Sequence, residues 1–188
     1  MFAFDKLPNI SDYRDISNIP YLLLGTLIVD IVVLFIIRYT GGGGKSLSAW
    51  YDKYGLVAII ADLSSIMIGF FLGQIIYTHC IMPYYGWNPL LFILIVVFVQ
   101  VVHDFAFYYF VILPIPLGHN AVIDLYKFYA EENGASIVRG NSLLMIASFL
   151  VTLGLKYLPE YVNTSIAIIT AYAMSYILYT KTNYPKKY

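Results

Sequence analysis

Two ionisable side chains stand next to each other inside a long apolar run. The run covers residues 97–111, VFVQVVHDFAFYYFV, and holds His103 and Asp104 at its centre. Helical periodicity places Gln100 and Phe107 on the same stripe as this pair, since the four residues follow the i, i+3, i+4, i+7 spacing. An imidazole beside a carboxylate can relay a proton, hold a cation, or pair internally and fix helix packing.

Two further aspartates lie inside other apolar runs at a similar depth. Asp30 lies in the run 20–38 and Asp62 in the run 55–81. If successive helices alternate in direction, a rise of about 1.5 Å per residue places Asp30, Asp62 and Asp104 about 10 to 14 Å from one common face. The sequence therefore predicts a buried polar layer from three helices, made of Asp30, Asp62, Gln100, His103 and Asp104.

This layer has three interpretations, of which we favour the first. Buried polar groups are costly to leave unpaired, so a hydrogen-bonded cluster would fix which helices pair and in what register. Alternatively, the acids and the histidine form the proton or cation relay of a channel or transporter. A metal or enzymatic role is least expected, because such sites usually need a second histidine and neither His79 nor His119 reaches the layer easily. The sequence predicts no catalytic set, no metal and no cofactor.

The composition indicates that membrane helices position these groups. Hydrophobic residues make up 60% of the 188 positions and charged residues 12%, with a mean hydropathy of +0.74, so too few charges are present to cover a soluble domain. A bilayer core takes about 20 helical residues. We expect an all-α, polytopic transmembrane helical bundle of about five spans, with four as the alternative because the fourth run is short. The predicted segments are a polar N-terminal arm (1–19), spans at about 20–39, 55–81, 88–113, 138–157 and 161–180, and a basic C-terminal tail (181–188).

The distribution of basic residues predicts the orientation. With five spans, most lysines and arginines fall on one side, and the positive-inside rule makes that side cytoplasmic. The N-terminus is then outside or lumenal and the C-terminus cytoplasmic. A net charge of zero gives no reason to expect a nucleic-acid partner, and Cys80, the only cysteine, excludes an internal disulfide.

Other residues are expected to hold the bundle together and to anchor it. Ser65, Gly69 and Gly73 follow Asp62 at helical spacing and form a stripe of small residues on which another helix can pack closely. Aromatic residues near the ends of the spans are expected to lie at headgroup level. These interfacial anchors are Trp50, Tyr51, Tyr54 and Trp87.

The loop after the third span contains an amphipathic pattern. Apolar residues recur at near-helical spacing from Val122 to Tyr129 among charged ones, and Asn133-Gly134 closes the segment. This pattern predicts a helix on the cytoplasmic surface of the membrane. It serves either as a connector or as a docking surface for a cytoplasmic partner.

The order of several segments resembles a family of multi-pass membrane proteins. The segments are LIVDIVVLFIIRY, WYDKYGLVAIIADLSSIMIGF, VQVVHDFAFYYFVI, PLGHNAVIDLYKFYAEENG and LLMIASF, between Ile19 and Tyr157. The family they resemble is encoded by nucleocytoplasmic large DNA viruses that infect algae and protists. The resemblance implies a place in a viral internal membrane beneath the capsid, with the capsid, other virion membrane proteins or further copies of this chain as partners.

Two functions are therefore expected from the sequence. The favoured one is a structural integral membrane protein of the virion or of host endomembranes, in contact with the bilayer and with capsid or neighbouring copies. The alternative is a channel or transporter that handles protons or cations through the buried aspartates and His103. The first predicts that the polar layer only holds helices together, whereas the second predicts ion movement that depends on it.

Overall fold

The structure is a computed structural model that describes residues 7–180. The first six residues of the predicted N-terminal arm and the whole predicted basic tail, 181–188, lie outside the described residues. Within residues 7–180 the chain is helical and contains no strand. The all-α prediction is confirmed for this part of the chain.

Four of the described helical segments are long and apolar enough to cross a membrane, and they match the first four predicted spans. Two of them extend through a π-helical turn, Tyr77–Ile81 in one and Tyr108–Ile112 in the other. Their main helices are α1 (Ile19–Thr40), α3 (Leu56–Ile76), which leads on into α4 (Met82–Tyr85), α5 (Pro89–Phe107) and α7 (Ser136–Leu155).

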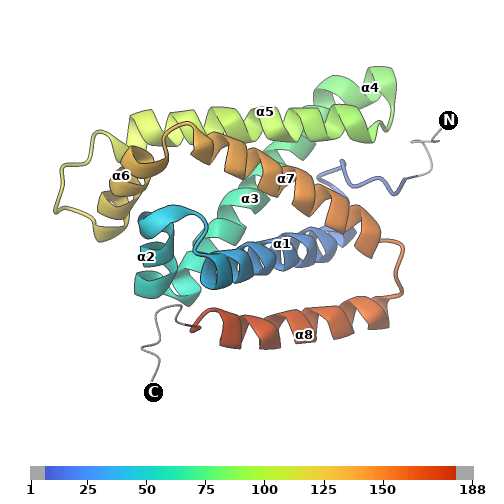
Figure 1. Cartoon of the computed structure of the whole chain (residues 1–188). Coiled ribbons are helices and arrows are strands. Elements are labelled where there is room, and N and C mark those ends of the chain that lie inside the picture. Colours follow the sequence, from blue (N-terminus) through green and yellow to red (C-terminus); the bar gives the residue numbers. More distant parts are fainter. Residues whose placement is uncertain (1–6, 181–188) are drawn as a thin grey trace.

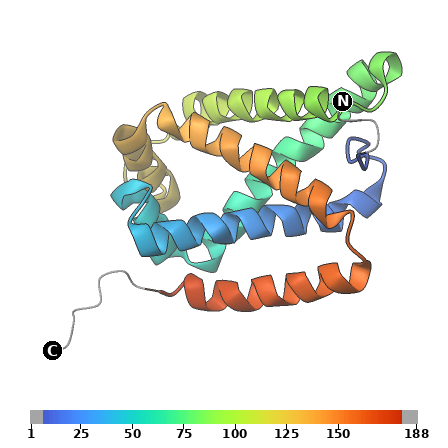
Figure 2. The same ribbon diagram turned by 45° about the vertical axis from the view of Figure 1, so that its right-hand side comes forward.

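The fifth predicted span also forms a helix, α8 (Glu160–Ile177). It is not among the four helices whose length and hydropathy suffice for crossing a membrane. It nevertheless packs along α1, and the two helices lie side by side in both Figure 1 and Figure 2. The structure thus shows four membrane-length apolar helices and a fifth, more polar helix beside them.

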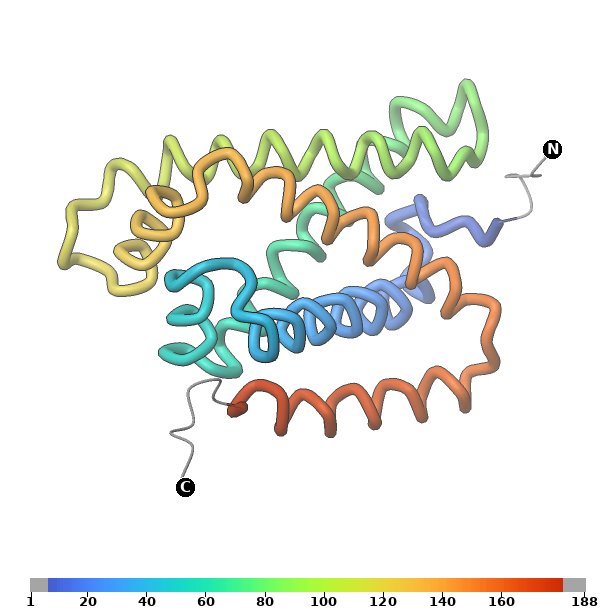
Figure 3. The backbone as a smooth tube through the Cα atoms, viewed as in Figure 1, coloured from blue at the N-terminus to red at the C-terminus, as the bar shows by residue number. Residues whose placement is uncertain are grey.

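The bundle has two ends of different construction (Figure 1). At one end, two short helices, α2 (Gly44–Tyr54) and α6 (Ala121–Asn133), pack on each other where α1 finishes and α3 begins. We call this the α2/α6 end. At the other end the N-terminal arm reaches the far turns of α3 (Figure 3), and we call it the arm end. The helix expected to be amphipathic is α6, which ends at Asn133 and is followed by Gly134, the pair expected to close this segment.

Local sequence explains where these helices begin and turn. The Asn88 side chain accepts hydrogen bonds from the backbone N–H groups of Leu90 and Leu91, and Pro89 occupies the first turn of α5, where it costs no hydrogen bond. Asn120 caps α6 in the same way. Between α2 and α3 the chain turns at Gly55, whose φ of 52° is readily adopted only by glycine. This turn folds α2 back against α3.

Large side chains fill the arm end. Tyr77, Phe92 and Phe149 pack with Val96 and Met145 into one buried cluster. The Phe92 ring contacts Tyr77 edge-on at 5.4 Å and lies 5.9 Å from Phe149, both between ring centroids. Aromatic contacts of this kind add to the packing between helices. The arm end is therefore a closed core.

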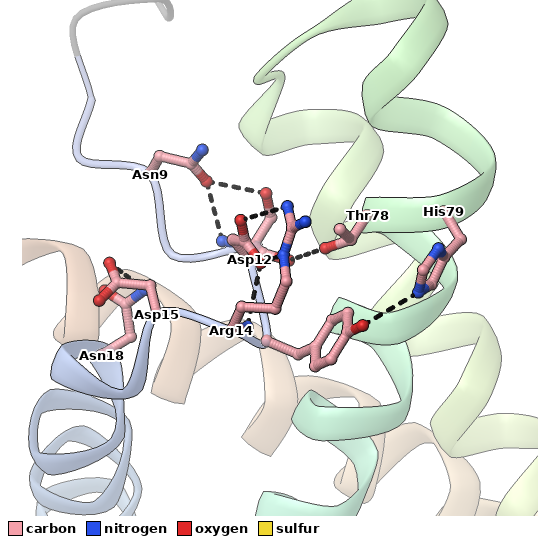
Figure 4. Close-up of polar contacts among 9 residues, drawn as sticks. Asn9, Asp12, Arg14, Asp15, Asn18, Thr78 and His79 are labelled. Carbon is pink, nitrogen blue, oxygen red and sulfur yellow. Dashed lines mark hydrogen bonds and ion pairs between the residues drawn. The ribbon is translucent and has the colours of Figure 1, made fainter.

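The N-terminal arm completes this core. Ile10 is fully buried, and its carbonyl oxygen accepts a hydrogen bond of 2.6 Å from Gln74. The Thr78 hydroxyl donates to the Ser11 carbonyl at 3.0 Å. Figure 4 shows the same segment reaching from α1 to the α3 side, where Tyr13 and His79 form a hydrogen bond of 3.2 Å. The described part of the predicted polar arm is thus packed onto the bundle.

Glycines allow neighbouring helices to approach each other closely. A Cβ on Gly73 would lie 3.3 Å from the Val96 Cα, and one on Gly69 would lie 2.9 Å from Gln100 Oε1. Both glycines belong to the predicted stripe. Gly25 on α1 makes a third close approach, to the Ser148 and Thr152 backbone of α7, which the sequence analysis did not identify.

Candidate functional site

A cavity of about 1160 Å³ occupies the α2/α6 end of the bundle. Its walls are mainly apolar and come from α1, α3, α5 and α7, with α2 and α6 closing over it. The predicted polar residues on its wall are Asp30, Asp62, Gln100, His103 and Asp104. The five residues that the sequence analysis grouped by their depth in the membrane therefore line one cavity.

Asp62 is held by the aromatic side chains of α2. The Trp50 indole N–H donates to both carboxylate oxygens, at 3.3 and 3.2 Å, and the Tyr51 hydroxyl donates at 2.9 Å. These contacts exist because Gly55 folds α2 back onto α3. Trp50 and Tyr51 are each only 4% exposed, so they face inward rather than outward as the interfacial anchors that the sequence analysis expected.

Burial, followed by the negative charges of Asp62 and Asp30, raises the pKa of the Tyr51 phenol well above its ordinary value. The phenol therefore stays protonated at neutral pH. A protonated phenol has one hydrogen to donate, and this hydrogen goes to Asp62. Tyr51 thus stabilises negative charge on the cavity wall.

The other two predicted anchors lie apart from the cavity. Tyr54 packs on Trp50 with ring centroids 5.0 Å apart. Trp87 belongs to the arm end, where its indole N–H donates to the Leu7 carbonyl oxygen at 2.8 Å. The four predicted interfacial anchors therefore lie in three places. Trp50 and Tyr51 are on the cavity wall, Tyr54 lies beside Trp50, and Trp87 is at the arm end.

A second polar cluster surrounds Asp104. Gln100 Nε2 donates to Asp104 Oδ1 at 2.7 Å, one helical turn away. Asn141 Nδ2 donates to Asp104 Oδ2 at 2.9 Å and ties α7 to α5. The sequence analysis did not include Asn141 in the polar layer; the signal that could have found it is an amide near the start of the short fourth span.

His103 stacks on Phe107 and is not held by Asp104. The two rings are nearly parallel, with centroids 5.9 Å apart. His103 Nδ1 lies 3.5 Å from Asp104 Oδ1 without making a hydrogen bond. Among the described residues, no hydrogen bond or ion pair joins Asp30 or Asp62 to His103 or Asp104, so the predicted layer consists of two clusters facing one cavity.

Two deeply buried acceptor atoms on the cavity wall have no partner. Asp30 Oδ2 and Gln100 Oε1 make no hydrogen bond, although each residue is only 2% exposed. An unpaired buried acceptor costs about 1 to 3 kcal/mol, and more when it is charged. Both atoms are almost fully covered by protein atoms, so a donor group in the cavity reaches them only when the Asp30 or Gln100 side chain turns toward it. Ser65, from the small-residue stripe, also lines the cavity.

No group of three or more His, Cys, Asp or Glu side chains within residues 7–180 is placed to hold a metal ion together. The carboxylates are spread around the wall instead. Such a distribution suits a bulky or mobile positive charge better than a tightly coordinated one.

Comparisons with known proteins give no match: no protein-family model fits the chain, and neither a curated protein nor a solved structure is similar to it.

Proposed function

We propose that this chain is a multi-pass integral membrane protein that takes up a cation in the cavity of the α2/α6 end. The observation that carries the proposal is the convergence of Asp30, Asp62 and Asp104, from three helices, on one cavity with unpaired acceptors. Intramembrane acids that face a cavity generally mark ion or proton pathways. In a layer that only holds helices together, Asp30 Oδ2 and Gln100 Oε1 would also be paired within the chain, as the oxygens of Asp62 and Asp104 are.

The proposal includes five spans. α8 contributes the fifth, because it lies along α1 and its partial polarity can be covered by that contact and by lipid headgroups. The basic residues near α2, α6 and the C-terminus then make the α2/α6 end cytoplasmic. The cavity lies at the cytoplasmic end of the bundle in this arrangement.

The closed core at the arm end makes a carrier more suitable than an open pore. Tyr77, Phe92 and the arm residue Ile10 fill the path beyond the cavity. A cation that enters from the α2/α6 end must wait for this core to rearrange before it can leave on the other side. We expect slow, saturable transport rather than channel-like conductance.

A structural role in a viral membrane is the second candidate. It is favoured by the bonds that tie separate elements together, Asn141 to Asp104 and Trp50 to Asp62. The viral setting rests on the resemblance described above. Protease protection and mass spectrometry of purified virions test this role: we expect the chain in the particle membrane, and its absence from particles would reject it.

Ion flux in proteoliposomes distinguishes the two candidates. Asp62→Asn and His103→Ala should each reduce uptake of a proton or monovalent cation. The matched control is Asp124→Asn, which removes a half-buried carboxylate that accepts a hydrogen bond from the Gly118 amide and does not line the cavity. Equal flux in all four proteins, with the proteins still folded, would reject cation handling and leave the structural role.

A further inference from the structure

The size of the cavity indicates what kind of cation it takes, an inference that rests on the proposed cation site. Its volume of about 1160 Å³ reaches the upper range of pockets that hold drug-sized organic molecules, roughly 300 to 1,000 Å³. A bare ion or a proton relay needs only a small fraction of this space. Most of the wall is apolar, so an aqueous ion would leave most of it without favourable contacts.

The unpaired atoms define the chemistry of the ligand's polar group. Asp30 Oδ2 and Gln100 Oε1 are acceptors, and neither is satisfied within the chain. The Trp50 indole and the Tyr51 hydroxyl both donate to Asp62, so these two donors are not free to pair with either acceptor. A group with several N–H donors and a positive charge satisfies what remains, and a primary ammonium has three such donors.

Aromatic rings continue from the polar groups along the wall. Trp50 lies 5.1 Å from Tyr126, and Tyr126 lies 6.1 Å from Phe107, between ring centroids. Phe107 in turn stacks on His103. Ring faces attract a nearby cation and also provide contact area for an apolar body. The wall is therefore suited to a molecule with a charged head and an apolar remainder.

We infer that the cavity binds a primary ammonium amphiphile, an alkylamine or arylalkylamine in its protonated form. Its ammonium group donates to Asp30 and Gln100, while its apolar chain lies between α5 and α7. Asp62, held by Trp50 and Tyr51, contributes negative charge without losing its own hydrogen bonds. A quaternary amine of the same length lacks N–H donors and should bind more weakly.

Tryptophan fluorescence can report on this site. The chain has two tryptophans, and Trp50 lines the cavity whereas Trp87 lies at the arm end. In a Trp87→Phe background, Trp50 is the sole reporter. The protein in lipid nanodiscs is titrated with decylammonium, decyltrimethylammonium and decanol, with empty nanodiscs as the baseline. Calorimetry on the same samples measures binding independently of the reporter.

Decylammonium should bind saturably and at least about tenfold more tightly than decanol, because tenfold corresponds to the weakest charge-assisted hydrogen bond. Asp30→Asn should weaken decylammonium binding by about the same factor, whereas Asp124→Asn should not. Size-exclusion profiles and circular dichroism establish that both variants are folded. Decyltrimethylammonium should fall between the amine and the alcohol.

Equal binding of decanol and decylammonium would overturn the inference, since the cavity would then be only an apolar slot for lipid chains. A silent decylammonium titration, together with inorganic-cation flux that Asp62→Asn abolishes, would overturn the amphiphile but keep the proposed cation site. If neither binding nor flux is found, both are rejected.

Discussion

The two ends of the bundle use the same helices for opposite purposes. At the arm end, α3 and α5 approach each other over Gly73, and Phe92 and Tyr77 are completely buried. At the α2/α6 end, the same two helices diverge around a cavity lined by carboxylates. The difference teaches that small residues let membrane helices pack closely where the core is apolar, whereas the helices that carry the polar groups enclose a cavity, which α2 and α6 cover.

The largest effect on stability should come from removing a large side chain from the core of the arm end. Phe92→Ala should lower the free energy of unfolding by about 3 kcal/mol, the lower end of the soluble-protein range, because lipid is itself as apolar as a core. Phe98→Ala on the same helix is the control, since this ring is 66% exposed. Unfolding in nanodiscs or mixed micelles measures both. Equal costs for the two variants would show that the arm end is not a packed core.

A wedge between α3 and α5 should have the next largest effect. Gly73→Leu forces a side chain against the Val96 backbone and should cost about 1 to 3 kcal/mol of unfolding free energy. At Gly154 on α7 an added Cβ meets no atom within 4 Å, so Gly154→Leu is the matched control. Thermal unfolding of both proteins compares them. If Gly73→Leu lowers the stability no more than Gly154→Leu does, the close approach of α3 and α5 would be contradicted.

Loss of one hydrogen bond between helices at the α2/α6 end should lower the free energy of unfolding by a smaller amount. Asn141→Ala removes the amide that joins α7 to Asp104, and such bonds in membranes average about 0.6 kcal/mol. Ser142→Ala serves as the control, because that hydroxyl bonds only the Val138 carbonyl of its own helix. We expect a small loss of stability for Asn141→Ala alone, with ligand binding also weakened. If Asn141→Ala lowered the free energy of unfolding as much as Phe92→Ala does, the arm end would not be the more tightly packed of the two ends.

The smallest effect concerns the contact between α2 and α6, the two short helices that cover the cavity and that we call its roof. The backbone N–H groups of Ser46 and Lys45, at the start of α2, donate to the Glu132 carboxylate of α6 and lower its pKa. A lowered pKa means that this contact stabilises the roof at neutral pH and is lost as the pH falls through the folded-state pKa. Amide exchange at Lys45 and Ser46 should therefore speed up in acid relative to the intrinsic rate.

The control for the roof is the neighbouring acid. Glu132→Gln should abolish the pH dependence of protection at these two amides, and Glu131→Gln should leave it unchanged. If exchange at Lys45 and Ser46 is independent of both pH and residue 132, α6 does not hold α2 through this contact.

The sequence predicted the helices better than it predicted their partners. Runs of apolar residues with Asn88 and Pro89 at a helix start follow from local rules, and so does the common depth of Asp30, Asp62 and Asp104. The inward rotation of Trp50 could not be predicted, because it depends on the backbone turn at Gly55 and on a carboxylate twelve residues away. Helical spacing fixes a stripe on one helix but not the direction in which a short helix folds back.

The same limit applies to contacts between distant segments. Asn141 reaches Asp104 across 37 residues, and Gly25 meets α7 through backbone atoms of Ser148 and Thr152. Arg38 is buried and donates hydrogen bonds to Asp52 and to the Leu178 carbonyl oxygen, which ties α1 to α2 and to the end of α8. Such pairings depend on the three-dimensional arrangement and have no signal in local spacing.

Carbodiimide labelling tests the central claim, that the acids of the α2/α6 end face a cavity that holds a cation. A hydrophobic carbodiimide is applied to the protein in nanodiscs, and mass spectrometry locates the modified carboxyl groups. We predict labelling at Asp30 or Asp62 that decylammonium or an inorganic cation suppresses, whereas neither should change any labelling at Asp124, which lies away from the cavity. Absence of label at both aspartates, or labelling that no cation suppresses, would contradict the account.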